Sequence, residues 1–148
     1  MIELVVLVGT VAITVAAGLM WRARQGALRG ARDLPIDLPP AVRELLDPAS
    51  RITLVQISTT FCASCRRTRA LLTDLAGRTV GLVHVEIDVT DRPEIATRLR
   101  VMSTPTTLAI NPRGNARGGA RGGTEVLRFS GVPRRDELLA ALRGHLAG

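Results

Sequence analysis

The chain contains two cysteines, Cys62 and Cys65, separated by two residues. Residues 54–57 before them form a short apolar, β-branched run, which predicts a buried strand. Residues 66–75 after them carry apolar side chains at helical spacing. The sequence therefore predicts that both thiols lie where a strand passes into a helix.

That position favours thiol chemistry. The first turn of a helix has unpaired N–H groups and the positive end of the helix dipole, which stabilise a thiolate and lower its pKa. Cys62 should gain most from this, whereas Cys65 should be more enclosed. At a spacing of three the side chains share one helix face and can close a disulfide. Arg66 and Arg67 add positive charge that solvent largely screens.

A zinc site and a pair of incidental core cysteines are the alternatives to redox chemistry at this position. Half of a zinc site would need two further ligands, and the only histidines, His84 and His145, lie at unrelated spacing. Two incidental core cysteines would not need this spacing at a strand–helix junction. We therefore expect no metal at this site, and the pattern favours redox chemistry.

Composition argues against nucleic-acid binding despite a net charge of +7. Aromatic residues make up 2% of the 148 residues, tyrosine is absent and the single tryptophan is Trp21. The chain therefore has no base-stacking platform and no recognisable nucleic-acid motif. All basic residues are arginines, so no lysine can assist chemistry.

Residues 4–21 carry no charge. As a helix they would extend roughly 27 Å, close to the thickness of a bilayer core. Glu3 is the only charged side chain before the run, and four arginines follow it by residue 32. A signal peptide usually has its basic residues before the apolar run instead. We predict an uncleaved single-pass anchor over residues 2–21, rather than a buried core helix. The arginine excess predicts a cytoplasmic redox domain, with an extracytoplasmic one as the alternative.

The remaining pattern predicts three parts: an anchor at 1–21, a basic linker containing Pro and Gly at 22–49, and a folded α/β domain at 50–148. Within the domain the expected strands are 52–58, 80–89, 106–110 and 126–129, and the expected helices are 62–76, 92–99 and 133–145. A βαβ unit followed by a hairpin predicts a mixed sheet with helices on both faces. The Gly- and Arg-rich composition of residues 111–123 predicts a mobile loop, and the sequence does not indicate its role.

Taken in order, the strand, the Cys62–Cys65 pair, the helix and the segment 103–106 (Ser-Thr-Pro-Thr) resemble the thioredoxin family over about residues 50–148. The resemblance implies a three-layer α/β/α fold with a central mixed sheet. It also implies that Pro105 is cis, that Thr104 offers its backbone to a bound substrate, and that Gly131 lines the same groove. The expected groove further includes Phe61, Ala63 and Ser64 beside the cysteines.

Two departures from the family concern the chemistry. Thioredoxins usually have Trp-Cys-Gly-Pro-Cys, where residues 61–65 of this chain are Phe-Cys-Ala-Ser-Cys. A buried family Asp that helps move the proton of the second thiol is replaced by Gln56, which cannot accept a proton as a carboxylate does. The family's partner lysine falls at His84. We hypothesise that His84, or Glu86, takes over proton transfer; an ordinary solvent-facing histidine is the alternative.

The sequence thus predicts a membrane-tethered thiol–disulfide oxidoreductase of cell redox homeostasis. Cys62 attacks substrate disulfides and Cys65 resolves the mixed disulfide. In a reducing cytoplasm the pair would act as a reductase. Expected partners are protein or small-molecule disulfides and an electron donor or acceptor, with no metal or organic cofactor. The alternative is a thioredoxin-like binding or redox-sensing module for a membrane partner, without turnover.

Overall fold

A computed structural model describes residues 1–24, 34–114 and 123–147, with the side chains of residues 21–24 excluded. Most of the predicted mobile loop at 111–123 lies outside these described residues. The domain is built on one five-stranded sheet with the strand order β1-β5-β4-β2-β3. Its strands are β1 (Leu34–Pro35), β2 (Ile52–Ser58), β3 (Leu82–Asp88), β4 (Thr106–Asn111) and β5 (Thr124–Ser130).

The sheet is mixed, as expected. β2 and β3 are parallel and joined by the helix α3 (Ala63–Gly77), whereas β4 pairs antiparallel with both β2 and β5. The four predicted strands and three predicted helices are confirmed with small shifts in their ends. The other helices of the domain are α2 (Pro40–Arg43), α4 (Pro93–Arg98) and α5 (Arg135–Leu146). Proline stands in the first turn of α2 and of α4, where its missing N–H costs no helical hydrogen bond.

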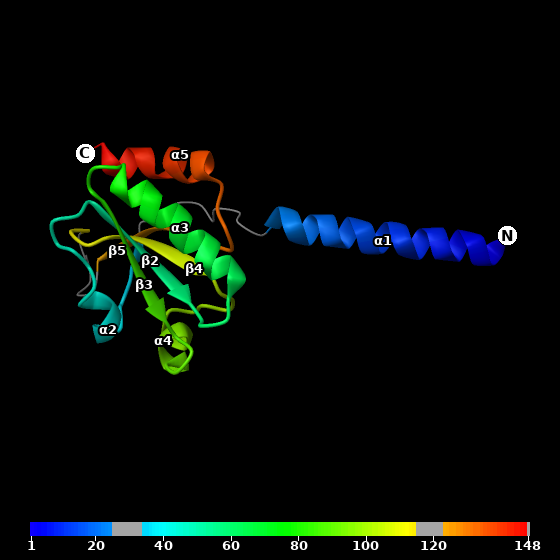
Figure 1. The fold of residues 1–148 in the computed structure, drawn as a ribbon, viewed down its shortest axis with the longest axis horizontal. Helices are drawn as coiled ribbons and strands as arrows, with labels where there is room; N and C mark the ends of the chain where they lie inside the picture. Colours follow the sequence, from blue (N-terminus) through cyan, green and yellow to red (C-terminus); the bar gives the residue numbers. More distant parts are fainter. Residues whose placement is uncertain (25–33, 115–122, 148) are drawn as a thin grey trace.

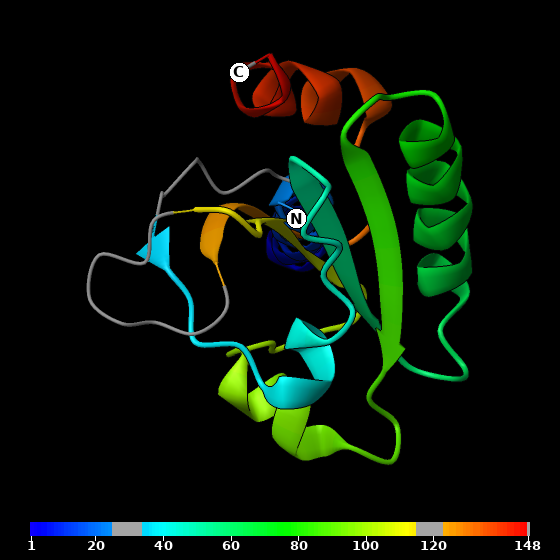
Figure 2. The same ribbon diagram turned by 90° about the vertical axis from the view of Figure 1, so that its left-hand side faces the viewer.

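Helices cover both faces of the sheet, so the fold has the expected three layers (Figures 1 and 2). α3 and α5 pack on one face over a core that includes Leu54, Leu72, Phe129 and Leu138. α2 and α4 pack on the other face over a second core. Because successive strand residues point to opposite faces, β2 contributes Ile52 and Leu54 to the first core and Val55 and Ile57 to the second. The even-numbered residues of β2, Gln56 among them, therefore face α3.

The folded domain begins earlier than residue 50, so the predicted linker at 22–49 is wrong over its second half. Leu34 and Pro35 pair with the edge of β5, and the side chains of Leu38 and Val42 are fully buried in the second core. In the sequence, residues 34–40 have only single apolar residues between prolines, a pattern typical of a linker. They fold because the α4 side of the sheet would otherwise expose its apolar surface.

The helix α1 (Ile2–Arg24) confirms the predicted helical run at the amino end. Its segment Ile2–Met20 has a mean hydropathy of 2.3 and none of it is buried. Among the described residues it alone is long and apolar enough to cross a membrane, although a signal sequence would share these properties.

Candidate active site

Three chain segments meet at one edge of the sheet. β2 ends at Ser58, β4 begins at Thr106 and β5 ends at Ser130, and the register pairs Ile57 with Thr106 and Thr106 with Ser130. The loops that continue from these ends therefore lie side by side. One leads into the cysteines, one holds Thr104 and Pro105, and one begins at Gly131.

Cys62 and Cys65 form a disulfide with their Cα atoms 5.2 Å apart. Cys62 is the N-cap of α3, and its Sγ accepts a hydrogen bond of 3.1 Å from the backbone N–H of Cys65. Ser64 Oγ lies 3.3 Å from the same sulfur. Cys65 is only 1% exposed, whereas Cys62 is partly exposed. An incoming sulfur can therefore reach Cys62, and the helix start stabilises negative charge on that atom.

The wall beside the disulfide is made by Thr104, Pro105 and Gly131. The Thr104–Pro105 peptide bond is cis, as the resemblance implied. Gly131 has φ 83°, a left-handed conformation that favours glycine, and its N–H donates a 2.7 Å hydrogen bond to the carbonyl of Pro105. Thr104 Oγ1 lies 3.3 Å from Thr59 Oγ1, which links this wall to the loop that carries the cysteines.

Large apolar side chains around the disulfide are left in solvent. Phe61 is 94% exposed and Met102 is 95% exposed, and Val132 is exposed to a lesser degree. Ala63 is exposed and Ser64 is half-buried. Exposed apolar side chains near a reactive group are typical of a binding surface. Met102 was not predicted, although its position two residues before Thr104 is a signal that could have found it.

Gln56 lies fully buried beneath the cysteines and connects them to two titratable groups. Its Nε2 donates to the carbonyl oxygen of Cys65 (3.0 Å) and to Glu86 Oε1 (3.2 Å). Its Oε1 lies 3.2 Å from His84 Nε2. Because the two partners of Gln56 Nε2 can only accept, the amide orientation is fixed, and His84 Nε2 must carry a proton. His84 Nδ1 then accepts from the Thr73 hydroxyl, 3.1 Å away.

The electrostatics of this network keep the imidazole neutral and the carboxyl ionised. Burial lowers the pKa of His84 below its usual value; the charge of Glu86 opposes this shift and that of Arg69 adds to it. Burial raises the pKa of Glu86, but the hydrogen bonds from Arg69 and Ser58, together with the charge of Arg69, outweigh that effect and leave the pKa lowered. His84 is half-buried and hydrogen-bonds to Gln56 and Thr73, and whether it transfers a proton stays a prediction.

A second polar cluster braces the loop that leads to the cysteines, and sequence reasoning missed it. The Asp88 carboxylate accepts from Thr60 Oγ1 (3.1 Å) and from the N–H of Thr90 (2.8 Å). The N–H of Thr60 donates to Thr90 Oγ1 at 3.0 Å. These hydrogen bonds from Thr90 and Thr60 hold the pKa of Asp88 below its usual range. The contacts of Thr60 join residues 28 and 30 positions apart, so no local sequence pattern predicts them.

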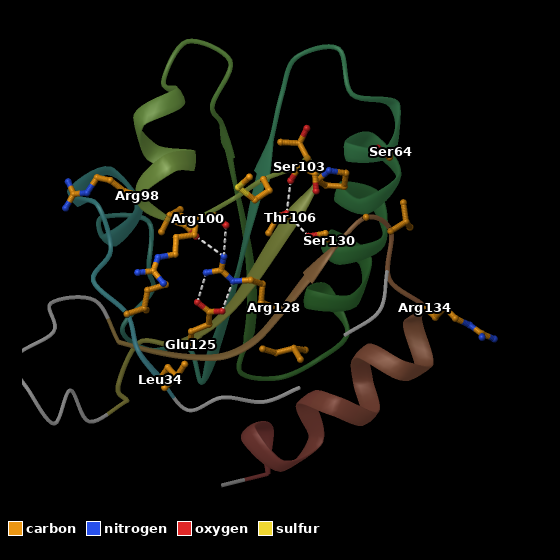
Figure 3. Close-up of a pocket in the computed structure, with 18 of the residues that line it drawn as sticks. Leu34, Ser64, Arg98, Arg100, Ser103, Thr106, Glu125, Arg128, Ser130 and Arg134 are labelled. Atoms are coloured by element: carbon orange, nitrogen blue, oxygen red, sulfur yellow. Dashed lines mark hydrogen bonds and ion pairs between the residues drawn. The ribbon is translucent and has the colours of Figure 1, made fainter. Parts of the chain in front are cut away.

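A groove begins at Ser64, next to the disulfide, and extends across β5 to Leu34 and Pro35 of β1. We name it the arginine groove: Ser64, Thr104 and Gly131 line one end, and Arg98, Arg100 and Arg128 line the other. Figure 3 shows Arg128 beside Arg100, with its guanidinium against the Glu125 carboxylate. Arg67 and Arg134 also border it near the disulfide.

The predicted site residues thus fall into two groups that the structure brings together. Phe61, Ala63 and Ser64 lie next to the disulfide, with Thr104, Pro105 and Gly131 across from them. Gln56, His84 and Glu86 form the hydrogen-bonded network beneath it. Their roles in chemistry stay predictions. Within residues 1–24, 34–114 and 123–147, no three side chains of His, Cys, Asp or Glu group as a metal site would require.

Comparison with known proteins places the domain in a family. Residues 41–133 match the model of the family described as thioredoxin. A comparison with curated proteins found no match. Among solved structures, Fasciola hepatica thioredoxin is 24% identical, with a TM-score of 0.51 over 66% of this chain and 84% of that one.

Two further solved structures have the same fold. Oxidised mitochondrial thioredoxin 3 from Saccharomyces cerevisiae is 19% identical, with a TM-score of 0.52 over 70% of this chain and 87% of its own. A thioredoxin variant from Halobacterium salinarum is 18% identical, with a TM-score of 0.56 over 80% and 96%. Similarity at such low identity shows only that the fold is shared, whereas the family model matches more than half of the chain. On that match, with its fold and its disulfide at the start of α3, the chain belongs to the thioredoxin family.

Proposed function

We propose that the protein is a membrane-tethered thiol–disulfide oxidoreductase that acts as a reductase. The observation that carries the proposal is the Cys62–Cys65 disulfide at the start of α3, with one sulfur accessible and the other enclosed. The thioredoxin fold with such a pair supports a thiol–disulfide oxidoreductase function. The tether and the direction of electron flow are the parts that we add.

In the proposed cycle the reduced protein attacks first. The Cys62 thiolate displaces one sulfur of the substrate disulfide, which leaves as a thiolate and takes up a proton, and a mixed disulfide forms. The Cys65 thiol then loses its proton and attacks the Cys62 sulfur. The Cys62–Cys65 disulfide forms, and the second substrate thiolate leaves. Two electrons and two protons pass to the substrate, and a dithiol donor later reduces the pair again.

The groove beside the disulfide is the proposed substrate site. Phe61, Ala63 and Ser64 contact the substrate from the helix side, and Thr104, Pro105 and Gly131 contact it from the other. Thr104 offers its backbone to an extended substrate segment, as the family resemblance implies. The exposed apolar surface of Phe61 supports this role, because burying it would favour binding.

Proton transfer for Cys65 is proposed to run through His84, with Glu86 as the alternative group. Gln56 hydrogen-bonds to both and to the carbonyl of Cys65, so it holds them next to the resolving cysteine. A lowered pKa leaves His84 neutral near pH 7. Its unprotonated nitrogen, Nδ1, accepts from the Thr73 hydroxyl, so to take the proton of Cys65 the imidazole has to release Thr73 and turn. If His84→Ala exchanges disulfides at an unchanged rate at every pH, this role is excluded.

No metal or organic cofactor takes part in this proposal, because the sulfur pair itself carries the two electrons. The apolar helix α1 anchors the protein, with the arginines after it on the cytoplasmic side. A reporter fused after Gly148 that is active only outside the cytoplasm tests the orientation. An inactive reporter supports the cytoplasmic reductase, and an active one points to an extracytoplasmic thiol pathway.

The direct test of function is turnover. The full-length chain, supplied with a dithiol, should reduce a fluorogenic disulfide peptide faster than the dithiol alone, and Cys62→Ser should abolish the acceleration. Slow exchange confined to one cellular partner would contradict the reductase and favour the redox-sensing module instead.

A further inference from the structure

We propose that the arginine groove selects substrates in which an acidic polypeptide segment flanks the disulfide. This inference rests on the proposed function and adds a substrate class to it. The proposed occupant is an extended chain that places its disulfide at Cys62 and its carboxylates along the arginines.

The charge of the groove is the first step. Five arginines line it (Arg67, Arg98, Arg100, Arg128 and Arg134), against two carboxylates, Asp37 and Glu125. Electrostatic complementarity of this kind raises association rates and excludes partners of the same charge.

Internal pairing divides the arginines into two kinds. Arg128 contacts Glu125 through two hydrogen bonds of 2.7 and 2.8 Å and also donates to the carbonyl of Leu99, so it holds the fold together. Arg98 lies 3.8 Å from Asp37. Each of these two arginines faces a carboxylate that lines the groove, but the Arg98–Asp37 pair is exposed and contributes little, so only Arg128 is firmly paired.

The other three arginines keep charge available for a partner. Among the described residues, no ion pair reaches Arg67 or Arg100. Arg134 has an exposed contact of 3.4 Å with Glu137, but its own side chain is 84% exposed at the rim of the groove. An exposed pair of this kind contributes little, so Arg134 can turn to a substrate carboxylate.

Arg100 supplies a second observation. Its φ is 53°, a left-handed conformation that is unfavourable for a residue with a Cβ. Arg100 therefore occupies a position where glycine would be more stable, and its side chain lines the groove. This gives a useful variant, because Arg100→Gly removes the charge while relieving the backbone.

The shape of the surface favours a polypeptide over a lipid headgroup layer. The five arginines line the same groove as Ser64, Thr104 and Gly131, and Ser64 Oγ lies 3.3 Å from the Cys62 sulfur. A flat bilayer surface cannot enter such a groove, whereas an extended chain can lie along it and present a sulfur to Cys62. Exposed Phe61 and Met102 beside the disulfide fit a partner with an apolar residue near its cysteine.

The experiment compares three fluorogenic disulfide peptides that differ only in flanking residues: glutamate, glutamine or lysine. The full-length chain is placed in nanodiscs of neutral lipid, and kcat/KM is measured at low and high salt. We expect the acidic peptide to be preferred over the neutral one by about tenfold at low salt, with the preference shrinking as salt screens the charges. The lysine peptide should be the poorest substrate.

The variant that tests the site combines Arg67→Gln, Arg100→Gly and Arg134→Gln, and Arg143→Gln on α5, outside the groove, is the control. The acidic-to-neutral ratio is taken within each variant, so changes in folding or in sulfur chemistry cancel. The triple variant should bring the ratio close to one, whereas Arg143→Gln should keep it.

Three results would overturn the inference. One is equal turnover of the acidic and neutral peptides by the unmodified chain at low salt. Another is loss of the preference in Arg143→Gln as well, since this would reflect net charge alone. The third result concerns lipid. If anionic nanodiscs slow the turnover of every peptide by the unmodified chain, but not by the triple variant, then the three arginines bind lipid headgroups. Failure of the proposed function looks different, because then no peptide is reduced at all.

Discussion

Replacing Gln56 by leucine tests whether the buried network holds the active-site helix on the sheet. The substitution removes the hydrogen bonds to the carbonyl of Cys65, to Glu86 and to His84, while keeping a similar volume. A neutral hydrogen bond contributes about 1 kcal/mol and one to a charged group about 1.5–3 kcal/mol. The apolar leucine recovers about 1.5–3 kcal/mol on burial. Because the buried Cys65 carbonyl then has no donor from Gln56 and the half-buried His84 and Glu86 each lose a partner, we expect a net loss of about 2–3 kcal/mol in the free energy of unfolding.

A loss of that size should lower the melting temperature by about 10–15 °C for a domain of this length. Far-UV circular dichroism of the full-length chain in detergent measures it, because the single tryptophan, Trp21, lies outside the domain and cannot report its unfolding by fluorescence.

The matched control is Thr107→Val on β4, directly opposite Gln56. Its hydroxyl is buried and has no hydrogen-bond partner within the described part of the chain. Removing it should be neutral or stabilise the domain by up to about 1 kcal/mol. Equal stability of Gln56→Leu and the unmodified chain would refute the reasoning, since the network would then contribute nothing.

Three further predictions concern single positions. The unmodified chain should lose stability as the pH falls below 6.5, because the pKa of His84 is lower in the folded chain and the unfolded chain therefore binds the proton more readily. His84→Gln should make this loss smaller, and denaturant unfolding at several pH values measures it. Gly131→Ala should cost about 1 kcal/mol or more and reduce kcat/KM, because φ is 83° there and the N–H holds Pro105; thermal melts with peptide turnover check it, and an unchanged melt would contradict the strain. Leu38→Ala should destabilise the domain by about 2–5 kcal/mol, while Leu34→Ala at the 53% exposed edge should change little; equal effects in urea unfolding would count against a folded 34–46 segment.

Much of the fold follows from local patterns in the sequence. The apolar spacing in α3 and α5 reflects one buried face of each helix, and the apolar alternation of β3 is typical of a strand, so periodicity is enough to find them. The sequence did not predict the strand β1 or the burial of Leu38, because a two-residue strand and a single core leucine between prolines show no periodicity. Their place depends on the sheet edge that they cover.

The candidate site divides in the same way. The cysteines, Thr104, Pro105 and Gly131 could be located because short motifs carry them. The brace between Thr60, Asp88 and Thr90 could not, since it joins loops far apart in the chain. The link from Gln56 to His84 was anticipated from the family's alignment, but its hydrogen bonds depend on strand register and side-chain direction. The arginine groove likewise exists only once β5 and α4 come together.

Trapping the mixed disulfide tests the central claim most directly. The Cys65→Ser chain, reduced and mixed with a disulfide peptide, keeps the attacking thiol but cannot resolve the intermediate. We expect peptide to accumulate on Cys62, as mass spectrometry would detect, and Cys62→Ser to capture far less because Cys65 is enclosed. Equal or faster capture on Cys65 in the Cys62→Ser chain would contradict the assignment of Cys62 as the attacking sulfur.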